Sequence, residues 1–317
     1  MPSIDMPLTE LRQYKPAITA QHDMAAFWKR SLEALRREPL SVNLSVRPLP
    51  LKGIDVFDVN YLGAGDALIT GELIVPTGAK AAPGIVVFHG YNGRRPHTFH
   101  VLHWAAVGAV VLTVDVRGQR GGASDNAVYP GPRTAGYMTA GIEDPNTYYY
   151  RHVFLDAVRA VDVLAGREEV DPNRLAVYGL SQGGALALAT AALEPRVALC
   201  MSEVPFLCDF ARAVSICGTN PYQEIAQYCR PLLEEQVNRI FRTLSYFDNV
   251  NLAGRIDART LISVGLCDTI CPPSGIFGVY NHLTCDKRIE IYPYMGHEAS
   301  TDFLELCMRE MAGQFEM

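Results

Sequence analysis

Three residues in this sequence could together carry out nucleophilic chemistry: a serine, a histidine and an aspartate. Ser181 lies in the stretch GLSQGG, with Gly179 two positions before it and Gly183 two positions after it. A serine hydroxyl is a poor nucleophile unless a histidine takes its proton and an acid orients that histidine. Asp268 and His297 follow later in the chain and could supply these two functions. The set predicts acyl transfer through a covalent intermediate on the serine.

The segments on either side of Ser181 strengthen this interpretation. Residues 174–179 (RLAVYG) predict a buried strand, and residues 183–194 (GGALALATAALE) predict a helix. A G-x-S-x-G sequence between a strand and a helix is typical of the nucleophile elbow, where the backbone turns sharply and only small residues fit beside the serine. With 26 glycines in the chain, the motif alone could arise by chance. The strand before it and the helix after it favour the elbow.

Asp268 and His297 each follow a predicted strand. These strands are residues 259–268 (RTLISVGLCD) and residues 287–298 (KRIEIYPYMGHE). The order serine, acid, histidine is that of α/β-hydrolases, and loops that follow parallel strands meet at one edge of the sheet. The alternative is an ordinary loop acid and a surface histidine. Weaker candidates lie inside or before other predicted elements: His152, His282, Asp248 and Asp257.

Two backbone N–H groups are needed to stabilise the oxyanion of the tetrahedral intermediate. One belongs to the residue after the nucleophile, Gln182. The other is expected from the loop HGYNG after the strand at residues 84–90, which makes Tyr91 the donor. The Tyr91 ring would also narrow the substrate pocket. The alternative interpretation of this loop is a structural turn.

A glycine-rich loop at residues 115–126 (DVRGQRGGASDN) has no standard chemical role. Within it, Arg117 and Gln119 are candidates for structural support of the active site. Glu298 stands beside the candidate catalytic histidine and could form an ion pair with Arg117.

The rest of the chain must position these residues. A helix at residues 22–37, with Asp23 as its N-cap, precedes strands within residues 1–80. From about residue 81 to 200, strands alternate with helices, which predicts an α/β fold with a mostly parallel central sheet and helices on both faces. Residues 97–108 predict one of these helices. Residues 206–250 show a helical pattern without a strand signal and predict a cap-like insertion within a single domain spanning residues 1–317.

Composition excludes several classes of protein. The net charge of −6 provides no basic surface for nucleic acid. The N-terminal segment lacks the pattern of a signal peptide, and the longest strongly apolar run, residues 105–114, is about half the length of a membrane helix. We therefore expect a cytoplasmic protein without a membrane partner, whose eight cysteines are reduced and mostly buried.

Two patterns could suggest a metal site. Histidines recur at every third position from residue 97 to residue 103, and Cys267 and Cys271 form a loosely spaced pair. Neither group has the second pair or the carboxylate partner that a metal site usually requires. We expect neither a metal nor a cofactor.

The sequence resembles carbohydrate esterase family 7, the acetylxylan esterase and cephalosporin C deacetylase family. Three signatures carry the resemblance: RGQ at 117–119, GLSQGG at 179–184 and GHE at 296–298. Weaker similarities extend it over nearly the whole chain. The resemblance implies a metal-free, intracellular α/β-hydrolase that assembles as a homohexamer. It also implies removal of acetyl groups from acetylated xylo-oligosaccharides and cephalosporin C through an acetyl-enzyme.

Carried onto this chain, the resemblance implies that Ser181 is the nucleophile, Asp268 the acid and His297 the base, with Tyr91 and Gln182 as oxyanion donors. The chain departs from the family at a few positions. Tyr137 stands where members often have Trp, and Glu203 and Phe206 stand where they often have Asp and Tyr. Phe206 is therefore expected to line the substrate pocket with Tyr91, in a shape particular to this chain. Two alternatives are a general short-chain carboxylesterase or peptidase and a non-catalytic binding protein with a hydrolase fold.

Overall fold

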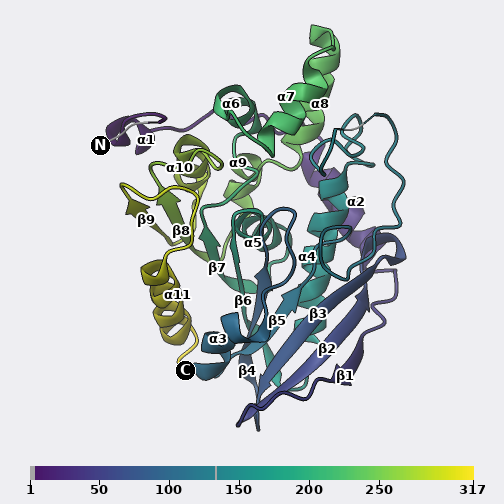
Figure 1. Cartoon of the computed structure of the whole chain (residues 1–317), viewed down its shortest axis with the longest axis vertical. Helices are drawn as coiled ribbons and strands as arrows, with labels where there is room; N and C mark the ends of the chain where they lie inside the picture. Colours follow the sequence, from purple (N-terminus) through teal and green to yellow (C-terminus); the bar gives the residue numbers. More distant parts are fainter. Residues whose placement is uncertain (1–3, 133) are drawn as a thin grey trace.

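The computed structural model describes residues 4–132 and 134–317, which are built around a nine-stranded sheet (Figure 1). The strand order across the sheet is β1-β2-β3-β5-β4-β6-β7-β8-β9. The strands are β1 (Asn43–Val46), β2 (Ile54–Leu62), β3 (Leu68–Pro76), β4 (Ala82–Phe88), β5 (Val110–Val114), β6 (Val170–Leu180), β7 (Val197–Glu203), β8 (Arg259–Gly265) and β9 (Lys287–Tyr292).

The sheet is parallel over most of its width. Strands β1, β2 and β3 pair antiparallel, and β3 pairs antiparallel with β5. From β5 through β4 to β9 every neighbouring pair is parallel. This confirms the predicted α/β fold with a mostly parallel sheet.

Helices cover both faces of the sheet, as predicted. On one face lie α2 (Met24–Leu35), α4 (Tyr149–Ala165), α5 (Gln182–Leu193) and α10 (Pro273–His282), whose apolar side chains form the larger core cluster. On the other face lie α3 (Leu102–Ala106) and α11 (Thr301–Gln314), which form a second cluster (Figure 1).

Strand β4 shows why both faces must be covered. All seven of its residues are buried. Val86 and Phe88 belong to the larger cluster, whereas Ile85 and Val87 belong to the second, because side chains alternate along a strand. Each such side chain contributes about 1.5–3 kcal/mol when fully buried.

Four helices separate β7 from β8. They are α6 (Phe210–Ile216), α7 (Tyr222–Cys229), α8 (Glu234–Ser245) and α9 (Asn249–Leu252). Figure 1 shows α6, α7 and α8 beyond the end of the sheet at which β7 and β8 finish. This agrees with the helical segment without strands predicted for residues 206–250.

Two predictions about the N-terminal half hold only in part. Asp23 is the N-cap residue of α2, as predicted, but its carboxylate accepts a hydrogen bond from the Tyr246 hydroxyl and caps no backbone N–H. The helix predicted at residues 97–108 is divided into a 3-10 turn (Thr98–His100) and α3, because Val101 leaves the helical conformation with φ −126°. A short helix, α1 (Leu8–Leu11), was not predicted. In the described part of the chain, none of the helices combines the length and the apolar character that crossing a bilayer requires.

Candidate active site

Ser181 lies on the sharp turn between β6 and α5. Its backbone has φ 60° and ψ −118°, a conformation that costs a non-glycine residue on the order of 1–3 kcal/mol. The flanking glycines are required by close backbone contacts. A Cβ on Gly179 would lie 2.3 Å from the Gly183 carbonyl carbon, and a Cβ on Gly183 would lie 2.2 Å from the Phe88 carbonyl oxygen. The turn therefore holds the serine at the carboxyl end of β6.

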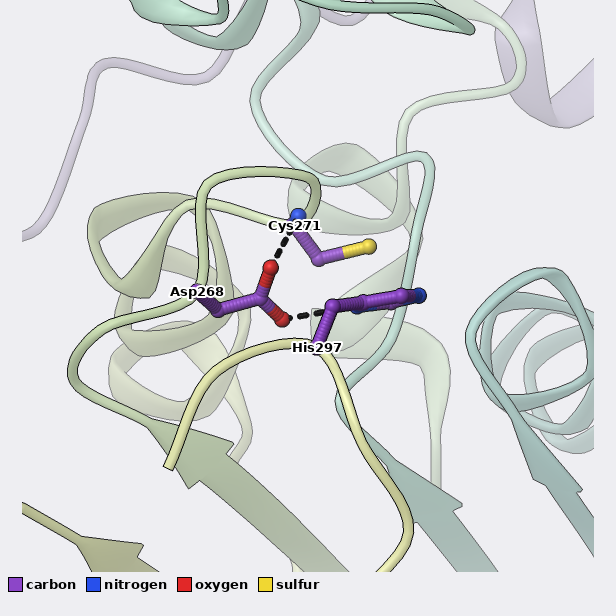
Figure 2. A group of neighbouring side chains, drawn as sticks. All are labelled: Asp268, Cys271 and His297. Carbon is purple, nitrogen blue, oxygen red and sulfur yellow. Dashed lines mark hydrogen bonds and ion pairs between the residues drawn. The ribbon is translucent and has the colours of Figure 1, made fainter. Parts of the chain in front are cut away.

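The structure brings the three predicted reactive residues together. His297 Nε2 lies 2.9 Å from Ser181 Oγ, and His297 Nδ1 lies 2.8 Å from Asp268 Oδ2. The other carboxylate oxygen of Asp268 accepts the N–H groups of Ile270 and Cys271, each at 2.8 Å. Figure 2 shows the carboxylate pointing at the imidazole from the loop that follows β8. This geometry lets the histidine receive a proton from the serine while the aspartate fixes the ring.

Glu203, the last residue of β7, fixes the segments that carry the serine and the histidine. Its backbone oxygen accepts the N–H of Ser181 at 2.9 Å. Its buried carboxylate accepts the N–H of Ser300, three residues after His297, and the hydroxyl of Tyr178 at 2.7 Å. Burial raises the pKa of Glu203. The sequence marked this position only as a departure from the family pattern.

The two predicted oxyanion donors lie on either side of the turn. Gln182 opens α5, and Tyr91 follows β4. Among the described residues, no backbone acceptor is paired with the N–H of Tyr91 or of Gln182. Gln119 supports this region through its side-chain amide, which donates to the Gln182 side chain at 2.8 Å and to the Tyr149 hydroxyl at 3.1 Å.

Tyr91 is tied to the helical insertion by a buried carboxylate on α7. The Tyr91 hydroxyl lies 2.9 and 3.0 Å from the two carboxylate oxygens of Glu224 and accepts the N–H of Tyr137 at 2.6 Å. Glu224 also accepts the N–H of Met138 at 3.1 Å, and burial raises its pKa. No local pattern in the sequence pointed to Glu224, which is 133 positions from its tyrosine partner.

Phe206 lies directly beside these residues. Its backbone N–H donates to the Ser181 carbonyl oxygen at 3.0 Å. Its ring is buried, 6.1 Å from the ring centroid of Tyr91 and 4.5 Å from that of Tyr222. Phe206 therefore packs behind Tyr91. Because Phe206 is the first residue of the insertion, the insertion is hydrogen-bonded directly to the backbone of the candidate nucleophile.

We expect Glu224→Gln to lower kcat for ester hydrolysis roughly tenfold while leaving KM within about twofold. A glutamine oxygen can still accept from Tyr91 and Met138, but these bonds lose the carboxylate charge, and the new NH₂ group lies 2.9 Å from the Tyr91 hydroxyl, so Tyr91 should shift. Complete loss of an oxyanion donor lowers kcat on the order of 100-fold or more, and a displaced Tyr91 N–H should lower it by a smaller factor. Steady-state kinetics would measure the change.

A double-mutant cycle provides the control for Glu224. Tyr91→Phe removes the hydroxyl that binds Glu224, so the two substitutions should give similar losses that do not add when combined. Additive losses, or a loss confined to thermal stability, would contradict a positioning role for Glu224.

The predicted ion pair between Arg117 and Glu298 is wrong. Arg117 is fully buried, and its guanidinium donates to both carboxylate oxygens of Asp156 on α4, at 2.6 and 2.7 Å. Glu298 is exposed and accepts the N–H of Gly296 at 3.1 Å. A buried guanidinium needs a buried counter-charge, and the exposed Glu298 cannot provide one. Arg117 thus supports the loop at residues 115–126 from beneath.

One group of side chains in the described residues has the composition and spacing of a metal site: Asp268, Cys271 and His297. The histidines at residues 97–103 form no such group there. Cys267 points away from this group, with its sulfur near the Pro293 carbonyl oxygen. All eight cysteines are free thiols.

The chain is similar in sequence to known esterases. The family described as acetyl xylan esterase (AXE1) matches residues 1–311. The acetyl esterase Axe7A of Xylanibacter ruminicola is 31% identical over 297 residues, which cover 91% of this chain and 66% of that protein. The quorum-quenching protein AidA of Acinetobacter baumannii is 29% identical over 54% of this chain and 50% of its own length. The chain thus spans between half and about two thirds of these curated relatives.

Solved structures give closer matches over the full length. An acetyl xylan esterase from a Paenibacillus species is 43% identical with a TM-score of 0.95, covering 97% of this chain and 99% of that one. Acetyl xylan esterase 1 from a Thermoanaerobacterium species is 36% identical with a TM-score of 0.94, covering 98% and 99%. The α/β-hydrolase GrgF from a Penicillium species is 18% identical with a TM-score of 0.59, covering 83% and 99%, and shares the fold alone.

Proposed function

Because the chain belongs to the acetyl xylan esterase (AXE1) family and is a carboxylic ester hydrolase, we propose that it removes acetyl groups from small acetylated substrates through an acetyl-enzyme on Ser181. One observation carries the proposed site: the unbroken series of hydrogen bonds from Ser181 through His297 to Asp268. Family membership supports the chemistry, and this series of hydrogen bonds supports the choice of residues.

The proposed reaction proceeds in two halves. His297 takes the proton of the Ser181 hydroxyl as its oxygen attacks the acetyl carbonyl carbon. The N–H groups of Tyr91 and Gln182 donate to the resulting oxyanion, and the alcohol leaves with the proton that His297 returns to it. Water then attacks the acetyl-enzyme by the same route, releasing acetate. Asp268 holds the imidazole in the required tautomer throughout.

We propose acetylated xylo-oligosaccharides and cephalosporin C as substrates. The relatives named as acetyl esterase and acetyl xylan esterases support the first of these. The resemblance to carbohydrate esterase family 7 supports the second. The intact hydrogen bonds between the three reactive residues argue against the non-catalytic alternative, because hydrolase-fold binding proteins usually lose one of them.

We further propose a single-domain protein that assembles as a homohexamer in the cytoplasm. The continuity of the sheet supports one domain, since its strands come from residues 43 to 292. The hexamer and the compartment rest on the resemblance alone. Size-exclusion chromatography with light scattering would test the hexamer.

Acyl-chain length separates an acetyl esterase from a general carboxylesterase. The Phe206 ring packs against those of Tyr91 and Tyr222, and its N–H donates to the Ser181 carbonyl oxygen, so we propose that these rings limit the acyl group to a small one. We expect kcat/KM to fall at least about tenfold from p-nitrophenyl acetate to the butyrate and further for longer esters, because each methylene is worth about 1–3 kcal/mol in a closed pocket. Equal rates on longer esters would favour the general carboxylesterase, and rates on acetylated xylo-oligosaccharides and cephalosporin C would rank the proposed substrates.

A further inference from the structure

Cys271 lies against the reactive residues but has no part in the proposed reaction. Its side chain is 1% exposed, and its backbone N–H donates to Asp268. The Cys271 sulfur, one carboxylate oxygen of Asp268 and one ring nitrogen of His297 all lie within 4.8 Å of one another. Figure 2 shows the Cys271 sulfur beside the imidazole ring of His297, with the Asp268 carboxylate close to both side chains.

A thiolate, an imidazole and a carboxylate are ligands that zinc prefers, and three protein ligands with a fourth open position are a common arrangement. Tetrahedral bonds of about 2.3 Å to sulfur and about 2.0–2.2 Å to nitrogen and oxygen place donor atoms about 3.4–3.6 Å apart. The three donors are already within 4.8 Å, so side-chain movements on the order of 1 Å would complete the site.

We propose that Cys271, His297 and Asp268 form an inhibitory binding site for a thiophilic divalent cation such as Zn²⁺ or Cd²⁺. On binding, the thiol proton of Cys271 passes to solvent and the sulfur lone pair bonds to the cation. The fourth position is open to the Ser181 hydroxyl or to water. No electrons are transferred, and the charge of the cation is balanced by the thiolate and the carboxylate.

The site couples cation binding to loss of the base. A cation on His297 Nε2 occupies the lone pair that receives the serine proton. A cation on Nδ1 takes the place of the proton that this nitrogen shares with Asp268, and the imidazole then carries its proton on Nε2. A protonated Nε2 cannot accept the proton of the Ser181 hydroxyl. Either geometry leaves Ser181 without a base. The inhibition therefore rests on the proposed role of His297, whereas cation binding itself does not.

The chemistry also predicts which cations act. Thiolate and imidazole select zinc, cadmium and similar cations, whereas Mg²⁺ and Ca²⁺ prefer oxygen ligands in larger number. The site offers a single carboxylate as an oxygen donor from these three side chains. Mg²⁺ should therefore leave hydrolysis unchanged at concentrations where Zn²⁺ inhibits.

The test is inhibition of p-nitrophenyl acetate hydrolysis by ZnCl₂ and CdCl₂, with each variant compared with its own uninhibited rate. We expect EDTA to restore activity and the inhibition constant to rise at least about 100-fold in Cys271→Ala. Cys267→Ala is the matched control, since it lies in the same loop with its sulfur directed at Pro293, and its inhibition constant should stay at the wild-type value. Equal inhibition of wild type and Cys271→Ala would overturn the proposal.

A direct binding measurement is independent of catalysis. The Ser181→Ala variant keeps all three ligands, and adding Cd²⁺ to it should produce the ultraviolet charge-transfer band of a cadmium thiolate. Ser181→Ala combined with Cys271→Ser should lose most of that band. Serine is used here because it keeps the size of the cysteine side chain, so this variant should keep its fold even if Cys271→Ala unfolds the loop. An undiminished cadmium-thiolate band in the double variant would overturn the proposed cation site. If Ser181→Ala shows the band but the wild type hydrolyses no ester, only the proposed function would be overturned.

Discussion

Ser181→Ala is expected to lower kcat for acetyl ester hydrolysis by on the order of 10⁶-fold, because it removes the hydroxyl that His297 Nε2 is placed to deprotonate. The Ser181 hydroxyl makes its hydrogen bond to His297 at 2.9 Å, so its removal leaves the turn, the glycines and the core contacts unchanged. Steady-state rates on p-nitrophenyl acetate would measure the loss, and circular dichroism would confirm the fold.

An exposed serine provides the control for this experiment. Ser215 is exposed on α6, and its hydroxyl donates to the Arg212 carbonyl oxygen of the same helix. Ser215→Ala should keep wild-type activity. A phosphonate directed at serine should label the wild type and Ser215→Ala but not Ser181→Ala. Residual activity of Ser181→Ala above about 1% of wild type would place the nucleophile elsewhere.

Asp268→Asn should lower kcat by about 10⁴-fold with a small effect on KM. The reason lies in the two backbone N–H groups of Ile270 and Cys271, which both point at one oxygen of Asp268. They will retain the oxygen of an asparagine, which turns its NH₂ group towards His297 Nδ1. That nitrogen must then accept a hydrogen bond, so the ring proton moves to Nε2, and Nε2 can no longer take the proton of Ser181.

This tautomer change gives the second experiment a spectroscopic readout. Nitrogen NMR of the imidazole should report the proton on Nδ1 in the wild type and on Nε2 in Asp268→Asn at neutral pH. Asp257→Asn serves as the control, because Asp257 is exposed just before β8 and should affect neither the spectrum nor the rate. A large loss of activity without a tautomer change would contradict the proposed role of Asp268.

The parts of the fold that sequence predicts are those with local signals. Residues 54–62 are rich in β-branched and aromatic side chains and are followed by a glycine, and β2 occupies the same residues. Strand β1 was missed because it has only four residues, of which three are exposed and one is half-buried, so it carries no apolar run. The order of the strands in the sheet, in which β5 lies between β3 and β4, depends on contacts far apart in the chain and has no local signal.

The site follows the same rule. The serine, acid and histidine were predicted because each comes directly after a strand, and parallel strands bring such positions together. The partners of buried charges were not predicted. Arg117 pairs with Asp156, 39 positions away, and Tyr91 with Glu224, because burial selects the partner and a sequence does not reveal which carboxylate will be buried beside a given group. The neighbourhood of Cys271 was missed because its spacing from Cys267 suggested only a paired-cysteine metal site.

The attachment of the helical insertion bears on how such enzymes can be altered by recombination. The insertion is joined to the reactive centre by bonds that include the Phe206 N–H donating to the Ser181 carbonyl oxygen and the Tyr91 hydroxyl donating to the Glu224 carboxylate. An insertion transferred from a relative to change substrate choice would therefore supply one partner of each bond, and the host would supply the other. Chimeras with crossover points at the ends of the insertion should keep the full kcat of the host only when the donor supplies a carboxylate at position 224. The insertion and the loop at Tyr91 should therefore be exchanged together, although more than a hundred residues separate them in the chain.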